Sequence, residues 1–271
     1  MVMIEVNGTR LHVEDTGPAP SGQTLLMSHG LLWSTELFRP QIDHLRQRFR
    51  VVAWDHRGQG QSDEDPRRTI GMELVTDDAR ALIGALGLGT VHFLGLSMGG
   101  FVGMRLAARW PELLRSLVLM NTSAEPEPRA NVPKHVALGT IAETLGLGLV
   151  VDRVMPLMFG RTTLTSPARA ALRDAWRAKL VGNRRSIVRA VRGVTGREGI
   201  EHLLPAIHTP TLVLVGDEDV STIPEKGRRI HEAIEGSRLV TIPRAGHSSS
   251  IEAPGEVNAA LDAFYDGLAG S

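Results

Sequence analysis

The sequence predicts an α/β protein with a mostly parallel, eight-stranded sheet flanked by helices and a helical cap inserted after the sixth strand. Three observations predict this fold class. Short apolar runs alternate with helical patterns of about ten or more residues, which is typical of βαβ units. An Asn7–Gly8 pair between two short strands indicates a hairpin. A long stretch without a strand pattern, residues 123–205, interrupts the alternation.

The first predicted element is a β-hairpin in which Met3–Val6 and Arg10–Val13 flank Asn7–Gly8. It would add antiparallel strands at one edge of the sheet. Apolar runs predict the following strands at Leu25–Ser28, Val51–Trp54, Val91–Leu94, Leu117–Met120, Thr211–Val215 and Leu239–Ile242. Helical patterns lie near residues 36–48, 72–86, 98–109, 224–235 and 254–268.

The interruption defines the expected domain organisation. Several prolines after the sixth strand mark a linker, and helix-like segments follow until the next strand begins. We therefore expect a core domain of residues 1–122 and 206–271, with a helical cap domain of residues 123–205 inserted into it.

The composition excludes several classes of protein. The chain of 271 residues has 30 Lys and Arg against 30 Asp and Glu, which argues against nucleic-acid binding by the whole chain. It contains no cysteine, so disulfides, thiolate metal sites and a cysteine nucleophile are absent. No signal peptide and no run of about 18 apolar residues occurs, so we expect a soluble, cytoplasmic protein that does not enter a membrane.

The most informative motif is Gly-x-Ser-x-Gly, formed by Gly95, Ser97 and Gly99. An apolar strand pattern precedes it and a helix pattern follows, which is the setting of a nucleophile elbow. The turn is so tight that glycines are needed two residues before and after the serine. We expect it to hold the Ser97 hydroxyl at the tip of the sheet. The N–H of Met98 would then lie at a helix N-terminus, where donors favour a developing oxyanion.

With four other segments, this turn resembles the α/β-hydrolase superfamily, and it is similar to bacterial serine carboxylesterases. The resemblance covers nearly the whole chain and implies the α/β-hydrolase fold. Phe93–Gly100 resembles 3-oxoadipate enol-lactonases, although His29-Gly30 departs from the small polar pair that those enzymes often carry. In chain order, the matching segments are His29-Gly30-Leu31, Asp55–Ser62, the elbow, Gly216-Asp217-Glu218-Asp219 and Ala245-Gly246-His247 with Glu252-Ala253-Pro254.

A serine hydroxyl needs a base to take its proton, and the triad order of this fold places that base after Ser97. Of the histidines there, His247 follows a strand and so lies where catalytic groups gather in open α/β sheets. The resemblance indicates the same residue. It also implies Asp219, in the Gly-x-x-Asp turn, as the acid that orients the imidazole, with Asp217 as the competing choice.

The resemblance implies a second oxyanion donor, the backbone N–H of Leu31, beside that of Met98. His29 and the segment Asp55–Ser62 are expected to be structural. For the substrate pocket we expect apolar walls contributed by Trp33 and by cap residues that include Leu138 and Met158.

These residues predict a serine hydrolase that cleaves a small or medium, mainly apolar carboxylic ester or lactone through an acyl-enzyme on Ser97, without a cofactor or a metal. Within enzymes, a C–C bond hydrolase and a cofactor-free perhydrolase are alternatives. From another class, a ligand-binding or signalling protein of this fold with slow turnover needs the same residues. The sequence does not indicate the oligomeric state or the natural substrate.

The neutral total charge conceals an uneven distribution. Residues 161–197 contain ten Lys or Arg and one acid, Asp174, whereas the rest of the chain has 20 basic and 29 acidic residues. A solvated cap surface explains this pattern. The sharper hypothesis is that the cap steers anionic substrates toward the site.

Overall fold

The chain opens with the predicted hairpin, in which β1 (Val2–Val6) and β2 (Thr9–Asp15) pair antiparallel. Asn7 and Gly8 between them have φ angles of 46° and 70°, the positive values that a tight hairpin turn needs. β2 joins the rest of the sheet by antiparallel pairing with β4 (Arg50–Trp54). The computed structural model describes residues 2–269.

The sheet has eight strands in the order β1-β2-β4-β3-β5-β6-β7-β8. All pairs from β4 to β8 are parallel, so the carboxyl ends of these strands meet at one edge. Each predicted strand is confirmed, with ends shifted by only a few residues. The other strands are β3 (Thr24–Ser28), β5 (Val91–Leu96), β6 (Leu114–Met120), β7 (Thr211–Gly216) and β8 (Arg238–Ile242).

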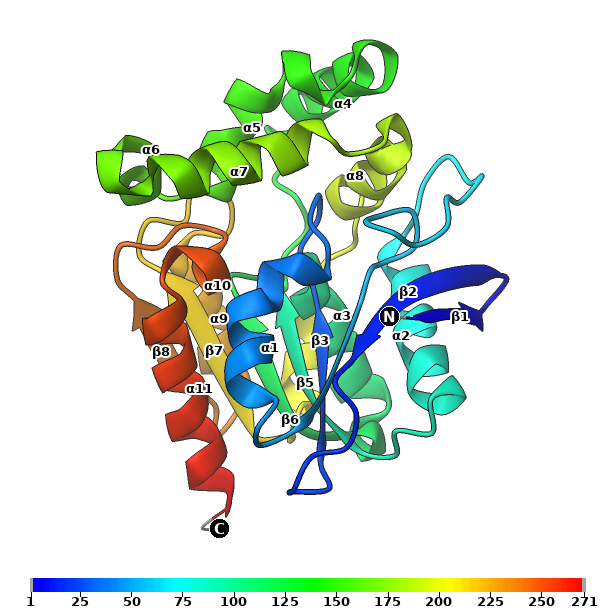
Figure 1. Cartoon of the computed structure of the whole chain (residues 1–271), viewed down its shortest axis with the longest axis vertical. Helices are drawn as coiled ribbons and strands as arrows, with labels where there is room; N and C mark the ends of the chain where they lie inside the picture. The colour runs from blue at the N-terminus through cyan, green and yellow to red at the C-terminus, as the bar shows by residue number, and fades with distance from the viewer. Residues whose placement is uncertain (1, 270–271) are drawn as a thin grey trace.

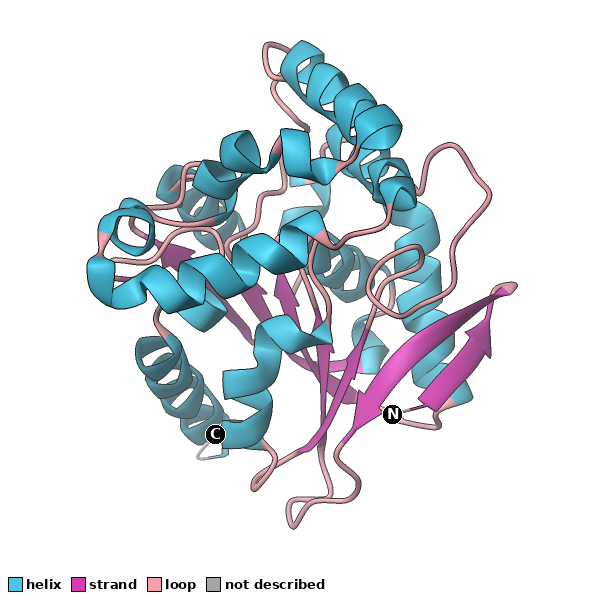
Figure 2. Ribbon diagram, turned by 45° about the horizontal axis from the view of Figure 1, so that its top comes forward, coloured by secondary structure: helices cyan, strands magenta, loops and turns pink. Residues whose placement is uncertain are grey.

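Helices cover both faces of the sheet (Figure 2). Strand residues alternate between the two apolar cores, since Leu26 packs toward one face and its neighbour Leu25 toward the other. One face carries α2 (Met72–Ala85), α3 (Met98–Arg109) and α9 (Pro224–Ala233). The other face carries α1 (Arg39–Leu45), α10 (Ser249–Glu252) and α11 (Pro254–Ala269). Two short 3₁₀ helices, η1 (Thr35–Phe38) and η2 (Pro111–Leu113), precede α1 and β6.

Between β6 and β7 the chain forms helices and loops but no strand, as expected for an inserted cap. These helices stack above one end of the sheet (Figure 1). The α-helices are α4 (Val132–Leu145), α5 (Val151–Met158), α6 (Arg161–Thr165), α7 (Ala170–Val181) and α8 (Val188–Thr195). The 3₁₀ helices are η3 (Leu147–Leu149), η4 (Pro167–Arg169), η5 (Arg185–Ile187) and η6 (Glu201–Ala206).

An aromatic cluster joins these helices to the core. The ring of Trp33 lies 5.0 Å from that of Trp176 on α7 and 5.9 Å from that of Phe159, in both cases edge to face. All three side chains are buried and belong to the apolar core that also contains α1 and α11. The inserted helices are therefore packed onto the core through a shared hydrophobic interior.

Several basic side chains of the inserted helices bond to acidic or carbonyl groups rather than standing free. Lys179 Nζ lies 2.5 Å from Glu36 Oε2, and Arg177 Nη2 lies 3.0 Å from Asp152 Oδ1. Arg184 donates to backbone carbonyls in the segment 60–62 of the core, at 2.6 and 2.7 Å. Part of the positive excess in residues 161–197 is thus opposed by acidic groups nearby, and part of it attaches the inserted helices to the core.

Across residues 2–269, no helix combines the length and the apolar character required to cross a bilayer.

Candidate active site

The turn between β5 and α3 has the geometry expected of a nucleophile elbow. Ser97 adopts φ 53° and ψ −109°, a strained conformation for a residue with a side chain. The flanking glycines are sterically required, because a Cβ at Gly95 would lie 2.2 Å from the carbonyl oxygen of Gly99. A Cβ at Gly99 would lie 1.9 Å from the carbonyl oxygen of Ser28 on β3. The neighbouring backbone therefore tolerates only glycine at these two positions.

The structure brings Ser97, His247 and Asp219 together from three separate loops at the carboxyl ends of β5, β8 and β7. His247 Nε2 lies 2.8 Å from Ser97 Oγ, and its Nδ1 lies 2.9 Å from Asp219 Oδ2. All three residues are buried. The competing acid, Asp217, is exposed and makes no hydrogen bond to His247. The arrangement is a continuous chain of hydrogen bonds from a carboxylate through an imidazole to a hydroxyl.

The Asp219 carboxylate is held in its charged form. Burial alone would raise its pKa, but the His247 ring and hydrogen bonds from Asn121 and Thr222 outweigh burial and lower the pKa. The N–H groups of Ser221 and Thr222 donate to Oδ1 at 2.8 and 3.0 Å. A charged Asp219 can therefore fix the tautomer of His247 and stabilise its protonated form.

Sequence reasoning missed Asn121, the residue that directly follows β6. It has a φ of 45°, and its side chain is buried. Its Nδ2 donates to Asp219 Oδ2 at 2.9 Å and to the Gly246 carbonyl at 3.1 Å, and its Oδ1 accepts from Ser249 Oγ at 2.5 Å. Asn121 thus contacts the acid and both sides of the loop that holds His247. An asparagine at the carboxyl end of a buried strand was the available signal.

Near Ser97, the backbone N–H groups of Leu31 and Met98 are among those with no acceptor within residues 2–269. Met98 is the first residue of α3, so the dipole of a twelve-residue helix adds to its donor. The loop that carries Leu31 is held by its neighbour Leu32, which has a φ of 70° and whose N–H donates to Gln59 Oε1 at 3.0 Å. Both N–H groups are therefore available as hydrogen-bond donors.

His29 and the segment Asp55–Ser62 hydrogen-bond to one another and to the loop that carries Leu31, which is what a structural role predicts. His29 Nε2 accepts from the N–H of His56 at 3.0 Å. Asp55 accepts from the N–H groups of Thr35 and Gln61 at 2.7 and 2.8 Å.

A second buried carboxylate connects the inserted helices to the histidine loop. Glu252 accepts from the N–H of Gly246 at 3.0 Å and from that of Ser248 at 3.2 Å, on either side of His247. It also accepts from the N–H of Gly160 at 2.8 Å and from Thr163 Oγ1 at 2.7 Å. Burial raises the pKa of Glu252 despite these donors.

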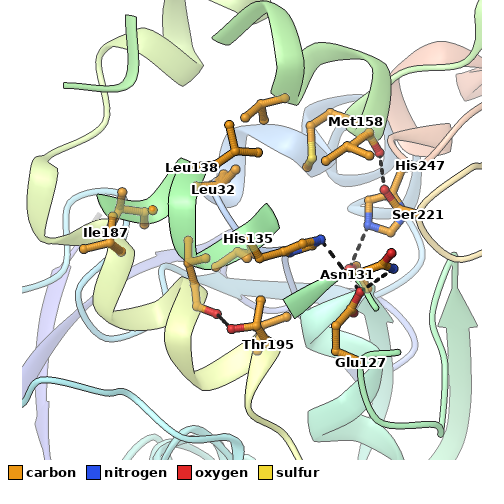
Figure 3. Close-up of a pocket in the computed structure, with 18 of the residues that line it drawn as sticks. Leu32, Glu127, Asn131, His135, Leu138, Met158, Ile187, Thr195, Ser221 and His247 are labelled. Carbon is orange, nitrogen blue, oxygen red and sulfur yellow. Dashed lines mark hydrogen bonds and ion pairs between the residues drawn. The ribbon is translucent and has the colours of Figure 1, made fainter. Parts of the chain in front are cut away.

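A cavity of about 190 Å³ opens beside Ser97 and His247 (Figure 3). Most of its lining residues are aliphatic. Many of them lie on α4, α5 and α8, and they include the predicted residues Leu138 and Met158. The prediction for Trp33 is wrong. Its ring packs against the rings of Phe159 and Trp176. Trp33 lines a separate pocket, which Leu32 also borders.

Comparison with known proteins agrees with the observed fold. Residues 23–254 match the family model of the alpha/beta hydrolase fold. The chain is 32% identical over 262 residues to a protein of Caulobacter sp. (strain K31) that is provisionally named carbamate hydrolase RutD, covering 95% of this chain and 96% of the relative.

Two solved structures are also similar. One is a thermophilic esterase from Thermogutta terrifontis, with a TM-score of 0.89, 29% identity and 98% of both chains covered. The other is the enol-lactonase from Burkholderia xenovorans, with a TM-score of 0.88, 29% identity and 98% of this chain and 100% of that chain covered. The chain therefore belongs to the α/β-hydrolase fold family and is a hydrolase.

Proposed function

We propose that this hydrolase cleaves a carboxylic ester or lactone through an acyl-enzyme on Ser97. The observation that carries the proposal is the hydrogen-bonded chain from Asp219 through His247 to Ser97 Oγ, at 2.9 and 2.8 Å, at the base of an apolar cavity. Among side chains, a positioned imidazole is the base that suits a serine nucleophile near neutral pH.

In the first half of the reaction, Ser97 Oγ attacks the carbonyl carbon and its proton moves to His247 Nε2. The carbonyl π pair moves to the oxygen, and the resulting anion is held by the N–H groups of Leu31 and Met98. When the C=O bond re-forms, the bond to the alcohol oxygen breaks and the alcohol takes the proton from His247. Water repeats the sequence, releases the acid and restores Ser97.

The cap supplies the substrate wall in this proposal. We assign residues 1–122 and 206–271 to the core domain and residues 123–205 to the cap. Leu138 and Met158 face the cavity from the cap. Because most of the lining is aliphatic and the volume is about 190 Å³, the part of the substrate next to the reacting carbonyl is small to medium and mainly apolar.

The test is hydrolysis of p-nitrophenyl acetate and butyrate by the wild type and by Ser97→Ala. We expect kcat/KM to fall by several orders of magnitude in the variant. The matched control is Ser21→Ala, an exposed serine in the loop before β3, which should keep wild-type rates. A negligible wild-type rate would reject the proposal and favour a ligand-binding role. A rate that survives Ser97→Ala would reject Ser97 as the nucleophile.

The provisional name of the Caulobacter relative favours a second candidate, a carbamate substrate. The same serine would then pass through a carbamoyl-enzyme. Burst kinetics with matched p-nitrophenyl esters and carbamates separate the two. Rapid, complete turnover of the carbamate with poor ester turnover would favour the second candidate, whereas slow release after one equivalent of p-nitrophenol would favour the ester.

A further inference from the structure

Besides the reacting residues, the cavity has a polar side formed by Glu127, Asn131, His135 and Arg197, here called the polar cluster. Three of them lie at the start of the cap and the fourth at its end. Figure 3 shows Glu127, Asn131 and His135 directed toward one another, and these residues line the same cavity as His247. The ester chemistry proposed above gives these side chains no task.

Glu127 is the centre of the polar cluster. Asn131 Nδ2 donates to its Oε1 at 3.0 Å, and His135 Nε2 lies 3.8 Å from the same oxygen. Arg197 Nη1 donates to its Oε2 at 3.3 Å. Burial alone would raise the pKa of Glu127, but the bond from Asn131 and the charges of Arg197 and His135 lower it. Glu127 is therefore a carboxylate facing a guanidinium.

Hydrogen bonds from Nε and Nη1 hold the guanidinium of Arg197 in place. Its side chain is only 4% exposed. Nε donates to the Glu125 carbonyl at 3.1 Å, Nη1 also donates to the Val194 carbonyl at 2.8 Å, and the guanidinium carbon lies 4.4 Å from the ring centre of Phe101. Nη2, in contrast, has no acceptor within residues 2–269. A buried guanidinium that lines a cavity thus keeps donors unused.

The polar cluster offers both kinds of hydrogen bond at once. Arg197 supplies donors, and each carboxylate oxygen of Glu127 retains accepting capacity. Glu127 and Arg197 carry opposite charges, so a carboxylate on a ligand would face Glu127 and an ammonium would face Arg197, each at the expense of its own hydration. A neutral group with an acceptor and a donor side by side satisfies both residues without adding a charge. The carboxamide group has this pattern.

We propose that the polar cluster is a recognition subsite for a neutral amide group on the part of the substrate that is remote from the scissile carbonyl. The amide oxygen would accept from Arg197 and the amide N–H would donate to Glu127. This proposal rests on the ester hydrolysis proposed for Ser97. It makes the substrate an ester or lactone with an aliphatic segment that ends in, or contains, an amide.

The experiment uses ester substrates whose remote end is a carboxamide, an isopropyl or a carboxylate group, which have similar sizes and the same branching. One series places the group on the acyl chain and a second on the alcohol chain, each over a range of spacer lengths. In at least one series, we expect wild-type kcat/KM for the carboxamide to exceed that for the isopropyl and the carboxylate about tenfold or more, since hydrogen bonds to charged groups are the strong ones.

The decisive variant is Glu127→Gln, which leaves Arg197 without its counter-charge. We expect the preference to shift toward the carboxylate substrate by about tenfold or more relative to the carboxamide. Merely structural damage would slow all three substrates alike. Arg197→Lys keeps a cation beside Glu127 but removes the forked donors, and it should reduce the carboxamide preference.

The matched control is Glu143→Gln, on α4 but paired with Arg192 outside the cavity, which should keep the wild-type order of substrates. No carboxamide preference in either series, or a preference unchanged in both cluster variants, would overturn the subsite. Loss of p-nitrophenyl butyrate hydrolysis in Ser97→Ala is measured separately, so a failed subsite leaves the proposed ester chemistry standing.

Discussion

Asn121 donates a hydrogen bond to the same oxygen of Asp219, Oδ2, that faces the His247 ring. Its second donor bond, to the carbonyl of Gly246, holds the residue just before His247. One amide therefore sets the distance between the acid and the base. It does so from the end of β6, a strand that contributes no member of the proposed triad, so Asn121 is a positioning residue.

Replacing Asn121 by Leu should therefore impair catalysis without touching the reacting atoms. We expect kcat/KM for p-nitrophenyl butyrate to fall about tenfold to a hundredfold, the usual consequence of losing an orienting partner. The unfolding free energy should fall by about 1–3 kcal/mol, because buried partners such as Ser249 Oγ lose a hydrogen bond. Wild-type kinetics in a folded Asn121→Leu would contradict this role.

The two acids of the β7 turn give a direct comparison. Asp219→Asn should lower kcat about 10⁴-fold, because the amide favours the wrong tautomer of His247. Asp217→Asn, at an exposed position two residues earlier, should remain close to the wild type. Comparable losses in both variants, measured with the same ester, would show that the hydrogen bond at 2.9 Å does not identify the acid.

The lowered pKa of Asp219 also predicts a contribution to stability with a definite sign. The unfolded chain takes up the proton at the ordinary value of 3.8, whereas the folded chain takes it up only at lower pH. The stabilisation is therefore present above about pH 4 and is lost as pH falls through the folded pKa. We expect the unfolding free energy of the wild type to fall more steeply below about pH 4 than that of Asp219→Asn, as measured by urea denaturation. Parallel curves would argue against it.

Glycine substitutions should separate close packing from helix propensity. Gly99→Ala would force a Cβ to within 1.9 Å of a backbone oxygen of β3, so we expect loss of activity and destabilisation by more than about 3 kcal/mol. Gly84→Ala lies inside α2 with open space around the added methyl, and it should stabilise the protein by about 0.5–1 kcal/mol. Thermal unfolding of both variants measures the contrast. An equally stable Gly99→Ala would disprove the steric argument.

Local patterns explain most of what could be predicted. Six of the eight strands follow from short apolar runs, because a central strand buried on both faces excludes polar side chains. The other two follow from the Asn7–Gly8 hairpin signal. The elbow follows from glycine spacing, because backbone contact admits no Cβ there. Position after a strand favoured His247, because parallel strands bring their carboxyl ends to one edge. The choice of Asp219 over Asp217 came from family resemblance.

What the sequence determined by itself was the succession of strands and helices along the core, the strained serine, and a histidine just beyond the last strand. Each of these depends on residues close together in the chain. Only the tertiary structure decided how distant segments meet. Trp33 turned out to pack in the core rather than to line the cavity, and Asn121 was found against Asp219. Glu127 and Arg197 lie 70 residues apart, yet they form one ion pair. Such contacts depend on how side chains fill space between whole elements, which no local pattern encodes.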